Sequence, residues 1–263
     1  MGERGLIGIV SGLGPLAGSD VLDQALAYAA GSYGATEDAE YPDIVLFSHG
    51  IESFDSTGSM DDTFLRELVA VVQEIELHHP TVLGIACNTA HLHLDTVLAH
   101  TEARFVNLIE ETAAAAAALE HRYLLLSSSI TRETGLYHDA LDRRNVDYVD
   151  VSGAEQLEID RVVHLVMAHE LETAGAAITR FVHHLRSPSS DGPSFDGIIA
   201  ACTELPIAFD HSAIGNQVPI VSSNQVLAYA LVDTYYRMQL MGRVRASEWP
   251  MATEPMRVTA SSR

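Results

Sequence analysis

Short apolar runs that alternate with longer helical patterns constrain the fold of this chain more than any other feature. Strand-like runs at 6–10, 43–47 and 81–86 are each followed by a helical pattern. A further run at 104–108 precedes the alanine-rich stretch 113–118, which is typical of a helix packed closely on a sheet. Because strands that alternate with helices form parallel sheets, the pattern predicts an α/β fold.

The same alternation starts again near residue 123. Apolar runs at 123–127, 146–151, 197–201 and 218–221 predict the strands of a second sheet, with helices between them. We therefore expect two similar lobes, each with a parallel sheet flanked by helices. An ancient duplication would relate the lobes by a pseudo-twofold axis.

The predicted lobes meet near residue 108. Lobe 1 is expected to cover residues 1–108 and lobe 2 residues 109–221. A C-terminal helix over about 222–245 is expected to pack back on lobe 1. Residues 246–263 show no periodicity, so we expect a flexible tail there.

The two cysteines of the chain occur in matching contexts. Residues 82–89 and 195–203 are both apolar, contain Gly-Ile and place Ala-Cys before a threonine, at Cys87 and Cys202. Ligands of parallel sheets bind at the carboxyl ends of the strands. Two lobes related by a twofold axis would bring these ends face to face, so the active site is expected in the cleft between them, with one sulfur on each side.

Two thiols on opposite sides of one carbon atom can invert a stereocentre. A thiolate removes a proton from one face, and a thiol delivers a proton to the other face. A free thiol has a pKa of about 8.5, so each sulfur would need help from backbone N–H groups or a helix N-terminus. The sequence thus predicts Cys87 and Cys202 as a catalytic acid–base pair.

All fifteen basic residues are arginine, and this excludes two cofactor classes. Pyridoxal phosphate enzymes need a Schiff-base lysine, and a Walker-type loop uses a lysine to reach nucleotide phosphates. A net charge of −21 argues against nucleic-acid or anionic-membrane partners. No apolar run has the length of a membrane helix or the pattern of a signal peptide, and two cysteines are too few for a disulfide framework, so we expect a cytoplasmic protein.

Two other chemical interpretations are weaker. Gly12, Gly14 and Gly18 form a pattern one residue longer than the dinucleotide-binding fingerprint, and glycines here also allow a small ligand to approach the backbone. A zinc site could be drawn from the two cysteines with His91 and His93, but the usual ligand spacing is absent, so no metal is predicted. His91 is better interpreted as a helix-start residue that orients the site.

Four motifs occur in order along the chain: GIVSGLGPLAG near the start, ACNTAH around Cys87, LLSSSITRETGLY at 125–137 and ACTELP around Cys202. Together they resemble the aspartate/glutamate racemase superfamily, most closely its aspartate racemase branch, over nearly the whole chain to about Arg245. The resemblance implies a two-lobed α/β fold, two catalytic cysteines, no cofactor, no metal and a homodimer.

The resemblance also implies roles for individual residues. Cys87 and Cys202 would be the acid–base pair, and the groups beside them would bind the substrate carboxylate and stabilise the negative charge that develops on it. The expected substrate-binding residues are Leu13, Gly14, Asn88, Thr89, Thr131, Arg132, Thr203 and Glu204, of which Glu204 matches an acidic residue beside the second thiol.

The chain departs from the family where a side-chain carboxylate would bind. The loop after the second strand, 47–60, contains no arginine, and 159–170 contains no lysine, although relatives often have these cations there. We expect Arg132 to substitute for them, with His49, Arg161 and His169 as the other choices.

The sequence therefore predicts a cofactor-independent amino-acid racemase that acts on aspartate or glutamate. Alternatives within the superfamily are a maleate-type cis–trans isomerase and a hydantoin racemase. The decarboxylases are disfavoured because they keep a single cysteine. An alternative of another class is a catalytically silent protein that binds a small carboxylate.

Overall fold

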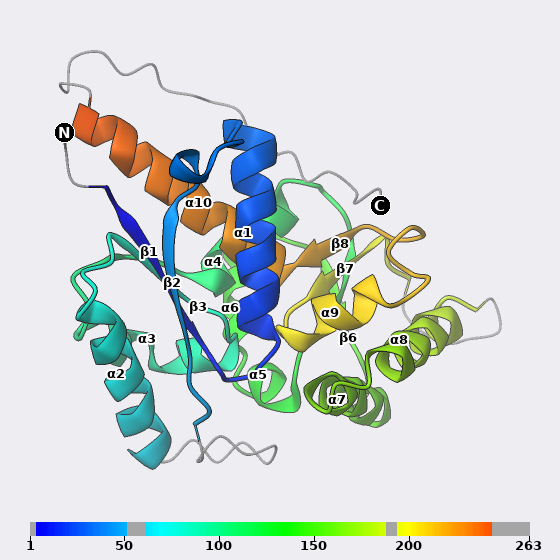
Figure 1. The fold of residues 1–263 in the computed structure, drawn as a ribbon. Coiled ribbons are helices and arrows are strands. Elements are labelled where there is room, and N and C mark those ends of the chain that lie inside the picture. The colour runs from blue at the N-terminus through cyan, green and yellow to red at the C-terminus, as the bar shows by residue number, and fades with distance from the viewer. Residues whose placement is uncertain (1–3, 52–61, 188–193, 244–263) are drawn as a thin grey trace. The chain divides into compact units, whose positions relative to one another are not determined.

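The computed structural model describes residues 4–51, 62–187 and 194–243 (Figure 1). The chain divides into two compact units. The described residues up to Leu108 and from Leu227 onward form unit 1, and the described residues from Ile109 to Val226 form unit 2. The boundaries fall inside two helices, α4 (Leu108–Ala117) and α10 (Ser223–Arg243).

Unit 1 is built on a four-stranded parallel sheet in the order β2-β1-β3-β4. Its strands are β1 (Leu6–Ser11), β2 (Asp43–Ser48), β3 (Val82–Ile85) and β4 (Arg104–Val106). Its remaining helices are α1 (Ala17–Tyr33), α2 (Asp62–Glu76), α3 (Leu94–Leu98) and two 3₁₀ turns, η1 (Asp38–Glu40) and η2 (Thr89–His93).

The sheet of unit 1 has an apolar core on each face. On one face, Ile7 and Ile9 of β1 share a buried cluster with Val21 of α1 and Leu231 of α10. On the other face, Val10 shares a second cluster with residues of α2, among them Phe64, Leu68 and Ile75. The alternation of side chains along a strand explains why neighbouring residues of β1 belong to different clusters.

Unit 2 repeats this architecture with a sheet in the order β6-β5-β7-β8, again all parallel. Its strands are β5 (Tyr123–Leu126), β6 (Tyr148–Asp150), β7 (Gly197–Ala200) and β8 (Ile220–Ser222). Its helices besides α4 are α5 (Ser129–Glu133), α6 (Leu136–Asp142), α7 (Gly153–Met167), α8 (Leu171–Leu185) and α9 (Glu204–Asp210).

In both units the strand that comes third along the chain lies beside the first strand. The second strand lies on the other side of the first, so the connections after the first and third strands leave in opposite directions. Such a switch point, at the carboxyl ends of the strands, is where ligands of open parallel sheets bind. The fold therefore predicts a site after β1 and β3 in unit 1, and after β5 and β7 in unit 2.

The predicted α/β fold with two parallel sheets flanked by helices is confirmed. The pseudo-twofold axis and the cleft concern the placement of one unit against the other and stay predictions. The helix expected after β3 is the five-residue α3, and a short 3₁₀ turn, η2, precedes it. Residues 246–263 and most of the loop at 47–60 lie outside the described residues.

No helix within 4–51, 62–187 or 194–243 is long and apolar enough to cross a membrane.

Candidate active site

The turn after β1 contains the predicted residues Leu13 and Gly14. Gly12 and Gly14 have φ angles of 100° and 108° and face each other in an isolated bridge. A Cβ atom on Gly12 would lie 2.1 Å from the carbonyl oxygen of His49, so only glycine fits. The side chain of Leu13 is buried in the same apolar cluster as Cys87. Leu13 can therefore contact a ligand only through its backbone.

The segment after β3 contains the first cysteine. The N–H of Ala86 donates to the carbonyl of Val10 at 2.8 Å, which extends the pairing of β3 with β1 to the residue before Cys87. Cys87, Asn88 and Thr89 follow at once, and all three are buried. The parallel pairing thus places these residues at the same edge of the sheet as the turn after β1.

The second cysteine has the equivalent position in unit 2. The N–H of Ala201 donates to the carbonyl of Leu126 at 2.7 Å, which extends the pairing of β7 with β5 to the residue before Cys202. In each unit, therefore, the cysteine is the second residue after the third strand and lies beside the end of the first strand. This equivalence of Cys87 and Cys202 comes from the backbone and does not depend on the motif comparison.

Cys202 lies in a buried acidic environment. Its Sγ donates to Oε2 of Glu204 at 3.0 Å, and Oγ1 of Thr203 donates to the same oxygen at 3.2 Å. Burial raises the pKa of Glu204, although the hydrogen bonds from Cys202 and Thr203 oppose this shift. A carboxyl group with a raised pKa is better matched to a thiol, so Glu204 can accept the proton of Cys202.

The short helix α5, which follows β5, contains Thr131 and Arg132. Ser128 is the N-cap of α5, and its hydroxyl donates to Oγ1 of Thr131 at 3.1 Å. Thr131 is buried, whereas Arg132 is half-buried and forms no salt bridge with the residues that the structure describes. Because β5 pairs with β7, this segment after β5 begins at the same sheet edge as Cys202.

A polar network from α7 holds the start of α5 and the residues before it in place. Asp160 accepts hydrogen bonds from the N–H of Ser129 at 3.0 Å and from its hydroxyl at 2.5 Å. The side-chain amide of Gln156 donates to the carbonyl of Ser127 at 2.9 Å and to Asp160 at 3.1 Å. The start of α5, the helix that contains Thr131, is therefore anchored by α7.

Sequence reasoning missed three buried residues of this region of unit 2. Tyr137 is hydrogen-bonded to Thr112, and burial, with a smaller contribution from the nearby Cys202, raises its pKa. Asn224, at the start of α10, donates through Nδ2 to the carbonyl of Thr203 at 2.8 Å. Tyr137 is the last residue of the motif LLSSSITRETGLY, so the sequence did contain a signal that it belongs to this region. The contacts made by Thr112 and Asn224 link distant parts of the chain and leave no local sequence signal.

The predicted residues thus form two groups, one in each unit. The first comprises Leu13, Gly14, Cys87, Asn88 and Thr89, and the second comprises Thr131, Arg132, Cys202, Thr203 and Glu204. Within each group the residues follow the first and third strands at one sheet edge. The facing of the two groups across a cleft is a prediction.

The helices that follow the cysteines are short. Only the 3₁₀ turn η2 and the five-residue α3 follow Cys87, and the seven-residue α9 follows Cys202. Help for each thiolate is expected from backbone N–H groups or from a helix N-terminus, but a helix of one or two turns aligns few peptide dipoles. The backbone N–H groups beside each cysteine are therefore the more important candidates for stabilising its thiolate.

The cysteine and histidine residues show no metal-binding geometry. No group of three or more His, Cys, Asp or Glu side chains in the described part of the chain is arranged to hold a metal ion. Both ring nitrogens of His91 contact backbone groups, the carbonyl of Cys87 and the N–H of Leu108. The ring is thus occupied by these contacts, and the zinc alternative gains no support.

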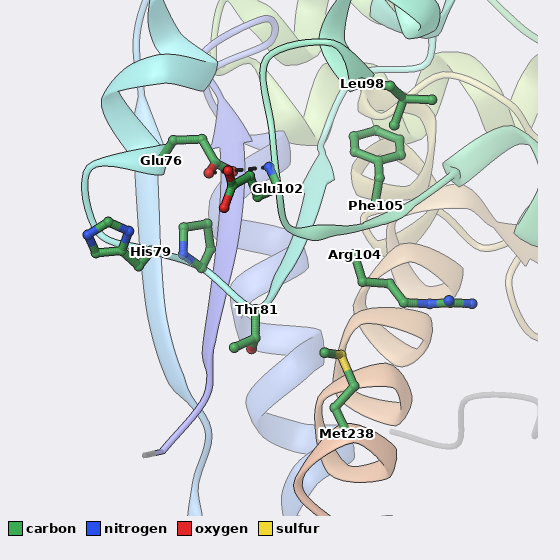
Figure 2. Close-up of a pocket in the computed structure, with 9 residues that line it drawn as sticks. Glu76, His79, Thr81, Leu98, Glu102, Arg104, Phe105 and Met238 are labelled. Atoms are coloured by element: carbon green, nitrogen blue, oxygen red, sulfur yellow. Dashed lines mark hydrogen bonds between the residues drawn. The ribbon is translucent and has the colours of Figure 1, made fainter. Parts of the chain in front are cut away.

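A cavity of about 740 Å³ lies at the opposite edge of the sheet of unit 1 (Figure 2). Its lining includes Thr81, just before β3, Arg104, the first residue of β4, and Met238 of α10. None of the predicted site residues lines it. The cavity is therefore separate from the chemistry proposed for the cysteines.

The fold and the sequence both match known racemases. A family model described as Asp/Glu/Hydantoin racemase matches residues 10–231. The broad specificity amino-acid racemase RacX of Bacillus subtilis (strain 168) is 22% identical over 234 residues, which are 89% of this chain and 100% of RacX. An aspartate racemase of Picrophilus torridus has a TM-score of 0.75 at 23% identity, over 88% of this chain and 94% of that chain. An aspartate racemase homologue of Pyrococcus horikoshii OT3 has a TM-score of 0.67 at 21% identity, over 88% and 98% of the two chains.

The family match includes both strand-end cysteines and all the predicted site residues. The predicted resemblance to the aspartate/glutamate racemase superfamily is confirmed, and with it the prediction of an isomerase of the racemase type. This chain belongs to the Asp/Glu/Hydantoin racemase family.

Proposed function

We propose that this protein is a cofactor-independent racemase of an acidic α-amino acid, aspartate or glutamate, with Cys87 and Cys202 as its acid–base pair. The observation that best supports the proposal is the equivalent position of the two cysteines, each two residues beyond the third strand of a sheet with the same strand order. A cytoplasmic location and a homodimer, expected from the sequence and the resemblance, belong to the same proposal.

In the proposed reaction, the thiolate of one cysteine removes the proton from the substrate Cα. The Cα–H bond breaks, an S–H bond forms, and the electron pair moves into the carboxylate to give an enediolate-like intermediate. The thiol of the other cysteine then donates its proton to the opposite face, so that its S–H bond breaks and a new Cα–H bond forms. The reaction requires the two sulfurs to lie on opposite sides of Cα.

Glu204 prepares Cys202 for both directions of this reaction. With its carboxylate 3.0 Å from the thiol, Glu204 can take the proton when Cys202 must act as a base and return it when Cys202 must act as an acid. The exchange leaves a single negative charge on the pair. This is important because the pair is buried, where a second unpartnered charge would be expensive.

The intermediate carries its negative charge on the substrate carboxylate. We propose that the backbone N–H groups and side chains of Asn88, Thr89 and Thr203 bind this carboxylate. Asn88 and Thr203 each directly follow a catalytic cysteine, and Thr89 lies two residues after Cys87. Donors that are fixed before the reaction stabilise developing charge without reorganisation. Asn224 supports this arrangement by holding the carbonyl of Thr203.

The second carboxylate of aspartate or glutamate also needs a partner. Arg132 is our candidate, because it follows β5 at the edge occupied by Cys202, is half-buried and has no salt bridge within the described residues. Arg161, another choice from the sequence, pairs instead with Glu158 at 3.5 Å. A paired arginine is a weaker ligand for an additional carboxylate.

The proposal is tested by incubating the purified protein in D₂O with the L and D forms of aspartate, glutamate and alanine, and with maleate and a 5-substituted hydantoin. NMR follows deuterium at Cα, and chiral chromatography follows inversion. We expect exchange and inversion with aspartate or glutamate, unchanged by prior EDTA treatment. Inversion of the hydantoin or isomerisation of maleate, without reaction of either amino acid, would replace the proposal by the corresponding alternative. Turnover of none of them would leave the binding protein as the better account.

A further inference from the structure

His91 lies four residues after Cys87 and is almost completely buried. Its imidazole makes hydrogen bonds to two backbone groups, with Nδ1 2.9 Å from the carbonyl oxygen of Cys87 and Nε2 3.2 Å from the amide nitrogen of Leu108. The ring of Phe105 packs beside it, with 5.8 Å between the ring centroids. The imidazole therefore connects the turn after β3 to the first residue of α4.

These two contacts define the protonation state of the ring. A backbone N–H can only donate, so Nε2 must carry a lone pair toward Leu108. A carbonyl can only accept, so Nδ1 must carry the hydrogen toward Cys87. Only the neutral Nδ1–H tautomer satisfies both contacts, because a proton on Nε2 would face the N–H of Leu108. In agreement, burial lowers the pKa of His91 to about 4, although the backbone contacts with Cys87 and Asn88 oppose the shift.

The contact with Cys87 also determines the direction of a donor. The carbonyl of Cys87 and the N–H of Asn88 belong to one planar peptide unit and point in opposite directions. By holding the carbonyl, His91 fixes the N–H of Asn88, one of the groups proposed to bind the substrate carboxylate. It also restricts the backbone from which the Cys87 thiol extends.

We propose that His91 is a positioning residue for Cys87, whose neutral Nδ1–H tautomer holds the Cys87–Asn88 peptide in the orientation that proton transfer requires, and which exchanges no proton with the substrate. This inference rests on the proposed function. It differs from the more usual role of a histidine beside a reactive cysteine, that of an acid–base group. Neither ring nitrogen can take that role without breaking its backbone contact.

The first experiment compares three variants in the full chain. Asparagine can keep the donor to the Cys87 carbonyl, whereas leucine fills the space but makes no hydrogen bond, and the exposed His184 of α8 provides a control. We expect His91→Leu to lower kcat/KM by about 100-fold or more, His91→Asn to stay within about tenfold of wild type, and His184→Leu to have no effect. The shape of the pH profile of kcat/KM should be the same in His91→Asn as in wild type.

An acid–base role gives the opposite pattern. If His91→Asn is as inactive as His91→Leu, or if an ionisation between about pH 5 and 8 disappears from the pH profile of His91→Asn, the proposal is wrong.

The second experiment measures Cys87 without turnover. In a Cys202→Ala background Cys87 is the remaining cysteine of the chain, so alkylation by iodoacetamide reports its reactivity alone. We expect His91→Leu to change the alkylation rate at pH 7 at least about threefold, and His91→Asn to stay within about twofold. Equal alkylation rates in Cys202→Ala alone and in its combinations with His91→Leu and with His91→Asn would show that His91 does not position the thiol.

The third experiment uses the wild-type protein, so it does not depend on the folding of a variant. Nitrogen NMR of the labelled imidazoles should show one histidine with a protonated Nδ1 and an unprotonated Nε2 that persists down to about pH 5. The opposite tautomer, or titration of every imidazole above about pH 6, overturns the proposal. Because alkylation and NMR need no substrate, they judge His91 separately from the proposed function, whose failure would appear as a wild-type protein without racemisation.

Discussion

The Sγ of Cys202 lies 3.0 Å from Oε2 of Glu204 and donates a hydrogen bond to it inside a buried region. In unit 1, the carbonyl oxygen of Cys87 lies 2.9 Å from Nδ1 of the buried His91. The two cysteines therefore have equivalent backbone positions, and Glu204 contacts the thiol of one whereas His91 contacts the carbonyl of the other. We expect Cys202 to depend on Glu204, and Cys87 to depend on backbone geometry.

Replacement of Glu204 should separate activity from stability. Glu204→Gln keeps the size of the side chain but cannot accept the proton of Cys202, so we expect kcat to fall about 100-fold or more. Steady-state racemisation assays check this. Glu133→Gln, which changes an exposed carboxylate of α5 and alters the net charge equally, is the control and should behave as wild type. Wild-type activity in Glu204→Gln would remove Glu204 from the mechanism.

The same variant should be more stable than wild type at neutral pH. Burial raises the pKa of Glu204 above its usual 4.5, so the wild-type fold has its full stability below the unfolded pKa and loses part of it as pH rises through the folded pKa. Glutamine has no charge to bury. Urea unfolding should show an advantage of Glu204→Gln that is absent at pH 4 and grows above it; a constant difference at every pH would contradict this cause.

His91 should make stability depend on pH in the opposite direction. The pKa of His91 in the folded protein, about 4, lies below the usual 6.5. The contribution of neutral His91 to the free energy of unfolding is therefore complete above about pH 6.5 and is lost as pH falls toward 4. The shift corresponds to about 3 kcal/mol. Urea unfolding of His91→Asn should show a weaker fall in the free energy of unfolding over this range, whereas His184→Asn should follow wild type. Parallel pH curves for all three proteins would refute the assignment.

Arg132 should affect only substrates with a second carboxylate. We expect Arg132→Ala to raise KM for aspartate about tenfold or more, because the variant lacks a charged hydrogen-bond donor, and to leave any activity on alanine unchanged. Arg180→Ala, at an exposed position of α8, is the matched control. An unchanged KM for aspartate in Arg132→Ala would dismiss Arg132 as the partner of the side-chain carboxylate.

Two glycines of unit 1 should respond oppositely to alanine. Gly12 has a φ of 100° and a Cβ there would lie 2.1 Å from the carbonyl oxygen of His49, so Gly12→Ala should destabilise by about 3 kcal/mol or more. Gly31 lies within α1 with nothing within 4 Å of the added Cβ, so Gly31→Ala should stabilise by about 0.5–1 kcal/mol. Thermal unfolding of both variants checks this, and equal shifts would contradict the strain at Gly12.

The strands could be predicted from sequence because buried parallel strands are continuous apolar runs bounded by turns. The runs at 6–10 and 197–201, for example, correspond to β1 and β7. The helix expected after β3 is present as the five-residue α3, but the sequence did not predict the 3₁₀ turn η2 that precedes it.

The site was predictable where its contacts are local. Glu204 is two residues from Cys202, so the motif already contains the interacting pair. His91 and Leu108 are seventeen residues apart, and the sequence gives no sign that their polar groups meet. The polar network of Asp160 with Ser129 likewise joins separate elements. Only the three-dimensional structure could show which side chains hold the loops.

The most direct test of the two-thiol account follows α-proton exchange in D₂O for Cys87→Ala and Cys202→Ala, with each enantiomer of the substrate supplied separately. We predict that racemisation falls at least about 10³-fold in both variants, because each lacks the acid or the base on one face. Exchange without inversion should survive for one enantiomer only, and the two variants should retain it for opposite enantiomers. Racemisation at the wild-type rate in either variant, or exchange of the same enantiomer in both, would contradict the account.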